Sequence, residues 1–314
     1  MLAIRTDGTT PEVEQVRRVR PAAGEVLVRV TDVVIDRRDV ELAKGGPGLR
    51  RGWDGRRTLG RHVTGVVAAP GAGVDGWPLG RAVALRPETV VRTGWHVPGA
   101  TDDGGLAEYV AVPVGSLVQL PRGLPDDVAT ALPLAARAHG ILERAGLRLG
   151  EAVGVWGAGS LGRSLVAVTR VMGAAEIVVV DPDPRAREAA LALGADTALT
   201  PGDLEGTALG LDVVVHAAPD AGAVPGALAG LAPGGRAVLI GVTDAAAGVG
   251  DWGDRTVSGP PRTPSESLPL VARLAATGRL RLPVATRLQG GLGAAVEGLR
   301  VGPDGPVHPV VVSP

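Results

Sequence analysis

One segment of the sequence has residue types and spacing suited to binding a diphosphate. Gly157, Gly159 and Gly162 form the pattern G-x-G-x-x-G, after a short apolar run and before a run with helical periodicity. Such glycines allow a tight turn, a close approach of the backbone to a pyrophosphate, and close packing of helix on strand. The free amides of Ser160 and Leu161, at the positive end of the helix dipole, would then bind the diphosphate of a dinucleotide.

Asp181 fits the same site, because it ends the next strand-like run, 19 residues after Gly162. A carboxylate at this point would accept hydrogen bonds from the adenosine ribose hydroxyls and would repel a ribose 2′-phosphate. This favours NAD(H), although Arg185 and Arg187 lie nearby and leave NADP(H) possible. The alternative is a glycine turn and a capping aspartate in an α/β domain that binds no cofactor.

The elements that must position these residues are of two kinds. Up to about residue 125, short strand-like runs such as Glu25–Val30 and Val63–Ala68 alternate with Gly-rich and Pro-rich turns, which is typical of an antiparallel barrel. From residue 126 strands alternate with helices, which indicates βαβ units and a parallel sheet. A helix at Ser265–Thr277 follows, and a strand at Val307–Val312 is expected to return to the first domain.

We therefore expect domain segments 1–125, 126–258 and 259–314. The expected elements of the middle segment are a helix from about residue 126 to Ala145, strands at Ala152–Trp156, Glu176–Val180, Leu211–His216 and Arg236–Ile240, and helices at Leu161–Met172, Pro184–Leu193 and Ala223–Leu231.

The composition narrows the class of protein. Of 314 residues, 45% are hydrophobic and 21% charged, so a packed core can form. The 32 basic and 33 acidic residues leave a net charge of -1, which attracts neither nucleic acid nor an anionic membrane. The absence of cysteine excludes disulfides and sulfur-ligated zinc. No signal peptide is evident and no run approaches the ~18 apolar residues of a membrane span, so we expect a cytoplasmic protein.

Several motifs in sequence order resemble the medium-chain dehydrogenase/reductase superfamily, which contains zinc-type alcohol dehydrogenases and quinone oxidoreductases. They are PAAGEVLV from Pro21, LG from Leu59 with VTGVV from Val63, GGLAEYVAVP from Gly104, the glycine turn, LGAD from Leu193, and PGGRAVLIG from Pro233. The resemblance implies an α/β fold, in which a split GroES-like β-barrel catalytic domain encloses a Rossmann domain with a doubly wound parallel sheet. It also implies an active site in the cleft between the domains and a homodimer or homotetramer.

The positions that bind zinc in the resembling family carry other residues here. The resemblance places Asp36 at the cysteine ligand, Arg61 at the histidine ligand and His62 at the following glutamate, and 131–133 offers no ligand. The stretch 87–103, which matches the structural zinc lobe, has no cysteine. Because arginines would repel a cation, we expect no metal.

The resemblance also suggests how a metal-free site would work. Hydride transfer to a carbonyl builds negative charge on oxygen, which a cation or a proton donor must stabilise. His62 would be the general acid or base, and Arg61 and Arg38 would hold an oxyanion or a substrate carboxylate. Asp36 would orient His62 or pair with an arginine, and Arg37 would reach the cofactor pyrophosphate. Alternatively, Asp36, Arg38 and Arg61 form a salt-bridge cluster with no chemical role.

We interpret the chain as a zinc-independent oxidoreductase that transfers a hydride between NAD(H) and a small alcohol or ketone. The resemblance adds Ala217, near the nicotinamide ribose, and Gly241 to the cofactor site. Lys44 is the single lysine, which indicates a GC-rich bacterial genome and fits a role in secondary metabolism. The alternatives are reduction of an activated C=C bond, because 131–135 resembles that branch of the family, and a non-catalytic NAD(H)-binding protein.

Overall fold

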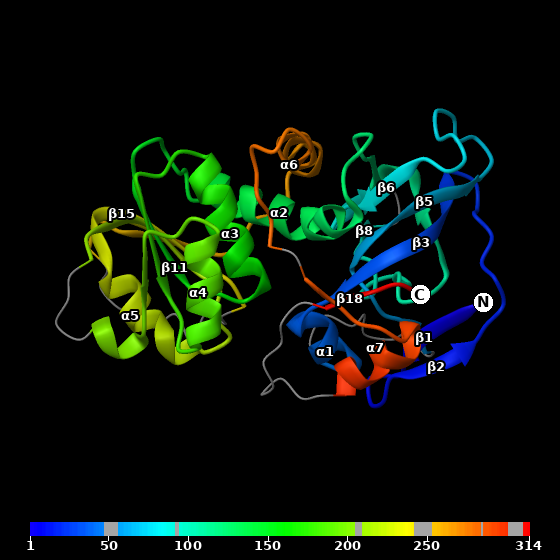
Figure 1. Cartoon of the computed structure of the whole chain (residues 1–314), viewed down its shortest axis with the longest axis horizontal. Coiled ribbons are helices and arrows are strands. Elements are labelled where there is room, and N and C mark those ends of the chain that lie inside the picture. The colour runs from blue at the N-terminus through cyan, green and yellow to red at the C-terminus, as the bar shows by residue number, and fades with distance from the viewer. Residues whose placement is uncertain (47–55, 92–93, 205–208, 242–252, 284, 301–309) are drawn as a thin grey trace. The chain divides into compact units, whose positions relative to one another are not determined.

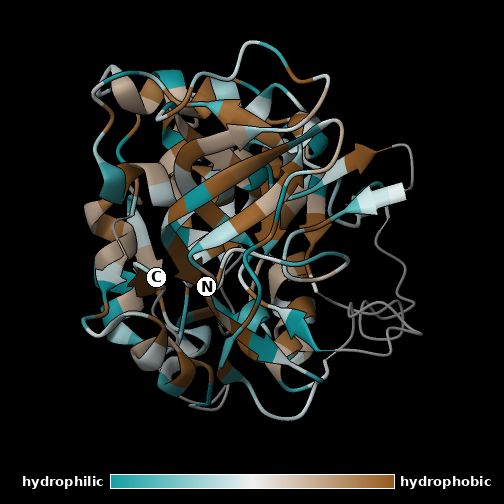
Figure 2. Cartoon of the chain, turned by 90° about the vertical axis from the view of Figure 1, so that its right-hand side faces the viewer, coloured by the Kyte–Doolittle hydropathy of each residue, from teal (hydrophilic) through white to brown (hydrophobic). Residues whose placement is uncertain are grey.

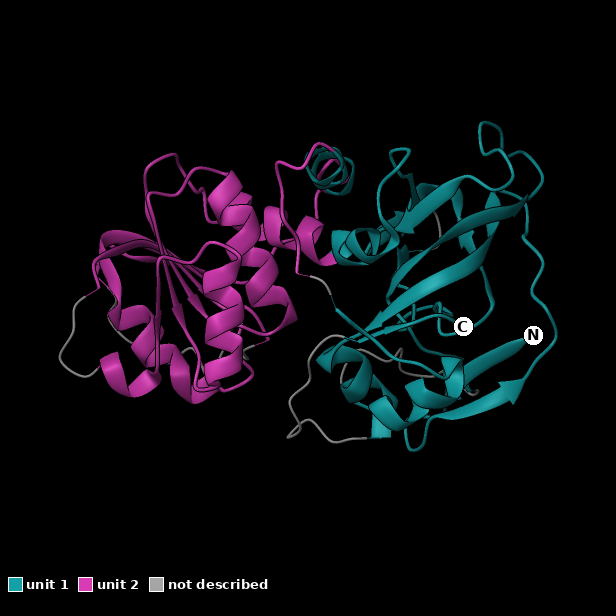
Figure 3. Ribbon diagram, in the orientation of Figure 1, with its two compact units in different colours: residues 1–133, 268–276, 284–314 teal, residues 134–267, 277–283 magenta. Residues whose placement is uncertain are grey.

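The computed structural model describes residues 1–46, 56–91, 94–204, 209–241, 253–283, 285–300 and 310–314. The chain forms two compact units, shown in Figure 3. Unit 1 comprises residues 1–133, 268–276 and 284–314, and unit 2 comprises residues 134–267 and 277–283. The predicted fold class is confirmed, since a β-rich unit is interrupted in sequence by a unit with a parallel sheet.

Antiparallel strands build most of unit 1. The long strand β3 is central to its main sheet and pairs with β5, β9 and β18. The strands are β1 Leu2–Thr6, β2 Glu12–Gln15, β3 Glu25–Ile35, β4 Arg57–Thr58, β5 His62–Pro70, β6 Ala82–Leu85, β7 Thr89–Val91, β8 Gly94–His96, β9 Tyr109–Pro113, β10 Leu117–Gln119, β17 Thr286–Arg287 and β18 Val310–Val312. Because β18 pairs with β3, the end of the chain returns to unit 1 as expected; residues 307–309 of the predicted strand lie outside the described residues.

The core of unit 1 lies among these strands. Figure 2 shows hydrophobic residues concentrated along them. Val28 on β3, Val63 on β5 and Val83 on β6 are fully buried in one apolar cluster, and Leu106 joins them from the loop before β9. Burial of this apolar surface is the main force that holds the barrel together.

Two helices of unit 1 were not predicted from the sequence. Helix α1 (Arg37–Ala43) begins after Asp36, whose carboxylate caps it, and packs against α7 (Gly291–Arg300). The glycines of α7 are poor helix formers, which hides this helix in a single sequence. Buried Leu42 and Leu299 tie the two helices to the same core. Helix α1 matters for function because it carries several of the predicted catalytic residues.

Unit 2 contains a parallel sheet of six strands in the order β13-β12-β11-β14-β15-β16. This is a doubly wound order: strands are added outward in one direction from β11 to β13 and in the other direction from β14 to β16, and such sheets bind ligands at the point of reversal between β11 and β14. Figure 1 shows helices packed around the sheet. The strands are β11 Ala152–Trp156, β12 Glu176–Val180, β13 Thr197–Leu199, β14 Leu211–His216, β15 Leu231–Leu239 and β16 Thr256–Ser258.

The remaining helices agree with the expected ones to within a few residues. They are α2 Asp126–Arg144, α3 Ser160–Val171, α4 Pro184–Ala192, α5 Val224–Ala229 and α6 Ser267–Ala276, with short 3-10 helices at Val114–Ser116, Pro201–Leu204 and Ala221–Ala223. Two predictions need correction. Residues 230–231 are not helical, and the strand expected at Arg236–Ile240 begins earlier, because β15 already starts at Leu231, opposite Leu211 of β14. No helix in the described part of the chain is both long and apolar enough to cross a membrane.

Candidate active site

The glycine turn joins β11 to α3, and two of its three glycines are sterically required. Gly157 has a φ of +96°, and a Cβ there would lie 2.7 Å from the backbone nitrogen of Ala218. A Cβ on Gly162 would lie 1.8 Å from the carbonyl oxygen of Gly157, so helix and turn touch at this point. Around Gly159, by contrast, a Cβ would have nothing within 4 Å. The turn therefore packs tightly against the sheet and is open at the start of the helix.

Helix α3 begins at Ser160 with Gly159 as its N-cap residue. No side chain in the described part of the chain caps it. The backbone N–H groups of Ser160 and Leu161 have no carbonyl partner within the helix, because the first turn of an α-helix lacks acceptors. An uncapped helix start beside open space, on a glycine turn, is suited to bind a phosphate group.

Asp181 lies at the end of β12 and is joined to the glycine turn. Its Oδ2 accepts a hydrogen bond from the backbone of Ala158 at 2.7 Å, and its Oδ1 accepts one from the backbone of Asp183 at 2.8 Å. Because a carboxylate has about four acceptor positions, two remain for ribose hydroxyls. The guanidinium of Arg187 donates to the carbonyl of Asp181, and Arg185 lies exposed on α4.

The two other predicted cofactor contacts in unit 2 follow the neighbouring strands. Ala217 comes directly after β14, and its backbone donates to the carbonyl of Trp156 at 2.7 Å, which places it beside the turn. Gly241 comes shortly after β15, exposed and with a φ of +72°. Ile240, next to it, donates to the carbonyl of His216 at the end of β14. The structure thus gathers both residues at the carboxyl ends of adjacent parallel strands.

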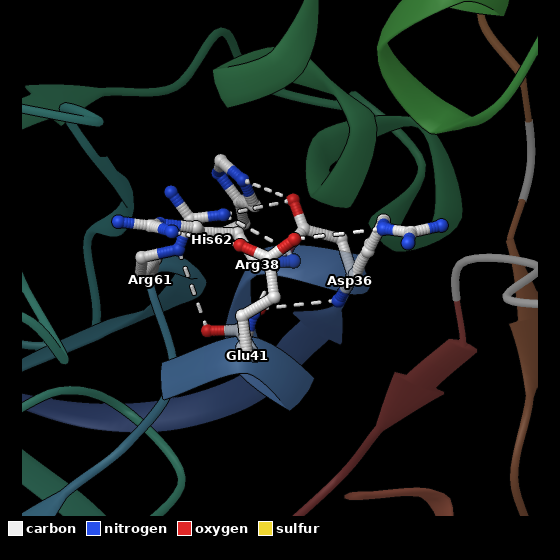
Figure 4. Close-up of polar contacts among 7 residues, drawn as sticks. Asp36, Arg38, Glu41, Arg61 and His62 are labelled. Carbon is white, nitrogen blue, oxygen red and sulfur yellow. Dashed lines mark hydrogen bonds and ion pairs between the residues drawn. The ribbon is translucent and has the colours of Figure 1, made fainter. Parts of the chain in front are cut away.

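A buried polar cluster in unit 1 is organised around Asp36. Its two carboxylate oxygens accept hydrogen bonds from Nη2 of Arg61 at 2.8 and 2.9 Å, and Nε2 of His62 lies 3.2 Å from Oδ2 (Figure 4). The same carboxylate accepts from the backbone nitrogens of Arg38 and Asp39 and so caps α1. Three of the four predicted catalytic residues, Asp36, Arg61 and His62, therefore lie together.

Asp39 is also part of this cluster, although it was not predicted from the sequence. Its carboxylate accepts from the backbone nitrogen of Asp36 at 3.1 Å, and its Oδ1 lies 3.5 Å from Nε of Arg61. Its side chain is 0% exposed. Aspartates three residues apart at the start of a helix form a capping box here, and this spacing was the available signal.

The charges in the cluster change how its acids titrate. Burial would raise the pKa of Asp36, but the charge of Arg61 and the contact with His62 outweigh it and hold this pKa well below its usual range. Burial and the nearby charge of Asp36 raise the pKa of Asp39 to about 7, although Arg61 opposes the change. Burial would lower the pKa of Arg61, but Asp36 and Asp39 raise it.

Arg37 and Arg38 lie on α1, and both pair with Glu41 of the same helix. Nη1 of Arg38 lies 2.7 Å from Glu41, and Nε of Arg37 lies 3.5 Å from the other oxygen of Glu41 (Figure 4). All three side chains are partly exposed, so these pairs add little to stability. The salt-bridge cluster considered as an alternative is thus present between Asp36 and Arg61, while the side chain of Arg38 pairs with Glu41.

Three other histidines have structural partners. His96 lies 3.1 Å from the hydroxyl of Ser116, and His139 lies 2.9 Å from that of Ser267. Nε2 of His216 lies 3.2 Å from the carbonyl of Asp220. Burial lowers the pKa of both His96 and His216, despite nearby acids. His96 and His216 therefore stay neutral near pH 7, and the contacts of all three histidines fit a packing role.

Comparison with known proteins yields two family matches. The alcohol dehydrogenase GroES-like domain matches residues 22–122, and the zinc-binding dehydrogenase family matches residues 160–253. An L-threonine 3-dehydrogenase of Pyrococcus horikoshii is 28% identical over 259 residues, which make up 75% of this chain and 73% of that protein.

Solved structures share the fold. A short chain alcohol dehydrogenase of E. coli CFT073, complexed with NADH, has a TM-score of 0.87 at 20% identity, over 100% of this chain and 99% of that one. A Sinorhizobium meliloti 1021 protein bound to NADP has a TM-score of 0.88 at 24% identity, with the same coverage. At these identities the likeness shows that the whole chain has this fold.

Proposed function

We propose that this chain belongs to the medium-chain dehydrogenase/reductase superfamily and transfers a hydride between NAD(H) and a small alcohol or ketone without a catalytic zinc ion. The two dehydrogenase family models match successive parts of the chain, and the fold is that of dehydrogenases bound to NADH and to NADP. The dehydrogenase family matches and the threonine dehydrogenase relative support an NAD(P)-dependent oxidoreductase. The choice of NAD(H), the absence of zinc and the role of each residue are the proposal.

The preference for NAD(H) rests on the surroundings of Asp181. Its carboxylate stays beside the glycine turn through the bond from Ala158, and it retains acceptor positions for two ribose hydroxyls. A 2′-phosphate in the same place would meet this negative charge. Arg187 could relieve the repulsion, but its Nη1 already donates to the carbonyls of Asp181 and Pro182, which leaves fewer donors for a phosphate.

The donor set in unit 1 does not fit a zinc ion. Zinc takes deprotonated sulfur, nitrogen or oxygen ligands at about 2.0–2.3 Å. Here both oxygens of Asp36 accept from a guanidinium at 2.8 and 2.9 Å, so a dication would sit beside a fixed positive charge. The match to the zinc-binding dehydrogenase family covers residues 160–253 and does not include Asp36, Arg61 or His62.

A bound nicotinamide supplies the hydride in reduction and accepts it in oxidation. As the carbonyl carbon of a ketone gains the new C–H bond, its π electrons move to oxygen, and His62 donates the proton that completes the alcohol. Nε2 of His62 faces the ionised Asp36, so the proton moves at Nδ1. In the oxidation direction His62 accepts that proton from the alcohol.

Arg61 and Asp36 prepare His62 for this step. The guanidinium holds the pKa of Asp36 well below its usual range, so the carboxylate stays charged beside the imidazole at all working pH values. A fixed carboxylate orients the ring, selects its tautomer and stabilises its protonated form. The single observation that carries the proposal is therefore the 3.2 Å contact between His62 and a carboxylate that Arg61 holds at both oxygens.

The test is the variant His62→Asn, studied with NADH and a panel of small ketones and activated alkenes. We expect kcat for the best ketone to fall by about 10²–10⁴, the usual contribution of a general acid, with unchanged NADH affinity in calorimetry. His96→Asn is the matched control, because His96 is also buried in unit 1 but contacts Ser116, and it should keep kcat.

Three results would contradict the proposal. Turnover of His62→Asn at the parent rate would remove the general acid. Reduction of alkenes but of no ketone would favour the C=C reductase alternative. NADH binding without turnover of any substrate would favour a non-catalytic binding protein.

A further inference from the structure

The strongest unexplained feature of unit 2 is an arginine with no counter-ion among the described residues. Arg163 lies on α3, directly after the last glycine of the turn, and is half-buried. Its Nε is buried and has no hydrogen-bond partner in the described part of the chain. Burial lowers the pKa of Arg163, and no acid that the structure describes opposes this change. An arginine stays charged even so, and a partly buried charge without a partner is costly.

The other arginine on this helix shows what a structural arginine looks like here. Arg170 donates to the carbonyl of Gly194 at 2.7 Å and forms an ion pair of 2.5 Å with Asp196. Seven residues separate Arg163 from Arg170, which is close to two helical turns, so the two lie along the same face of α3. Along that face, Arg170 lies beside Gly194 and Asp196, and Arg163 lies at the end that begins with the glycine turn.

Helix geometry directs Arg163 toward the turn. Side chains on an α-helix lean toward its N-terminus and cover the preceding turn, which for Arg163 is Gly159 and Ser160. That turn has no side-chain cap within the described residues, and around Gly159 a Cβ would meet nothing within 4 Å. The N-terminal end of α3 therefore combines free backbone N–H groups, open space at Gly159 and, one turn into the helix, a cationic side chain that leans toward this end.

We infer that Arg163 binds a phosphate oxyanion of the dinucleotide, which serves as its counter-ion. The inference rests on the proposed function, since it assigns a residue to the cofactor site of the same enzyme. A guanidinium binds phosphate oxygens with paired hydrogen bonds and adds a full charge to the partial charges of the helix start. The oxyanion is either the shared pyrophosphate or the 2′-phosphate that only NADP(H) carries.

The experiment compares the parent protein with Arg163→Met, Arg163→Lys and Arg170→Gln. Calorimetry measures the affinity of each for NADH, NADPH and inorganic pyrophosphate, and a thermal scan without ligand measures Tm. We expect Arg163→Met to weaken at least one dinucleotide about tenfold, the effect of one charge-assisted contact to a partly exposed group, and Arg163→Lys to recover part of it. Equal losses for both dinucleotides assign the pyrophosphate, and a loss for NADPH alone assigns the 2′-phosphate.

Arg170→Gln is the matched control, with the opposite pattern. It should lower Tm because it breaks the pair with Asp196, while dinucleotide affinity stays at the parent value. Arg163→Met should not lower Tm in the absence of ligand, because it removes a charge that no described acid balances. Added salt should weaken binding of the dinucleotide to the parent protein more than to Arg163→Met.

Two results would overturn the inference: parent affinity of Arg163→Met for both dinucleotides, or a fall in its unliganded Tm as large as that of Arg170→Gln. Failure of the proposed function looks different. If the parent protein binds neither dinucleotide but binds pyrophosphate in an Arg163-dependent way, the phosphate site stands and the proposed function fails. If it binds none of the three, both fail.

Discussion

Replacing Asp39 by asparagine tests the electrostatics of the cluster in unit 1. Asp39 is 0% exposed and its pKa is raised from 3.8 to about 7, first by burial and then by the charge of Asp36. The native state therefore holds a proton on Asp39 between about pH 4 and pH 7, where the unfolded chain has released it. The free energy of unfolding therefore falls as pH rises through that range, because the native state holds the Asp39 proton more tightly than the unfolded chain does.

The magnitude follows from the two pKa values. For a shift from 3.8 to about 7, linkage gives a loss of about 2–3 kcal/mol of stability between about pH 5 and pH 8. The asparagine of Asp39→Asn would be neutral at every pH and, like protonated Asp39, can accept from the backbone of Asp36. The variant should therefore lack this loss, so that its stability relative to the parent improves by about 2–3 kcal/mol from pH 5 to pH 8.

The assay is urea unfolding of both proteins at several pH values, followed by circular dichroism. All other titrating groups are shared, so the difference between the two proteins isolates Asp39. Asp32→Asn is the control: this buried carboxylate on β3 pairs with Arg287 at 2.5 Å, and its loss should destabilise the protein at pH 8. A difference between parent and Asp39→Asn that does not change with pH would refute the reasoning.

Three further substitutions test other parts of the account. Asp181→Ala should weaken NADH more than NADPH in a binding titration, because it removes both the ribose acceptor and the repulsion of a 2′-phosphate; equal losses would remove its proposed role. Gly162→Ala should lower Tm and abolish NADH binding, since its Cβ would lie 1.8 Å from the carbonyl oxygen of Gly157, and parent-like binding would contradict this geometry. Arg61→Met should cost about 3–5 kcal/mol in urea unfolding at neutral pH, because Asp36 is left buried without its cation; a cost within error of zero would show that the pair is not buried in solution.

The secondary structure of unit 2 around the glycine turn could be predicted closely from the sequence. The strands Ala152–Trp156, Glu176–Val180 and Leu211–His216 have the predicted bounds, because buried parallel strands are continuous apolar runs bounded by turn residues. The turn Gly157–Gly162 is largely a local feature: Gly162 is required by the carbonyl of Gly157, five residues earlier, and Gly157 by the backbone of Ala218 after the neighbouring strand β14.

The polar cluster of unit 1 could be predicted only in part. Asp36, Arg61 and His62 were identified through family positions, and the structure brings them together. Asp39 was missed because its burial and its contact with Arg61, which is distant in sequence, come from tertiary structure, and only its local capping contact with Asp36 is visible in the sequence.

Arg163 was missed for a related reason. In the sequence it is one arginine among many on amphipathic helices. Only the absence of a counter-ion within the described structure distinguishes it from Arg170, which is paired with Asp196.

The central claim is that hydride transfer in this protein uses protein charges in place of a metal ion. The most direct measurement is the turnover of NADH with the best ketone substrate, made on protein stripped by a strong chelator and assayed for metal by elemental analysis on the same sample. The account predicts undiminished kcat with substoichiometric metal. Activity that is lost on stripping and restored in proportion to added zinc would contradict it.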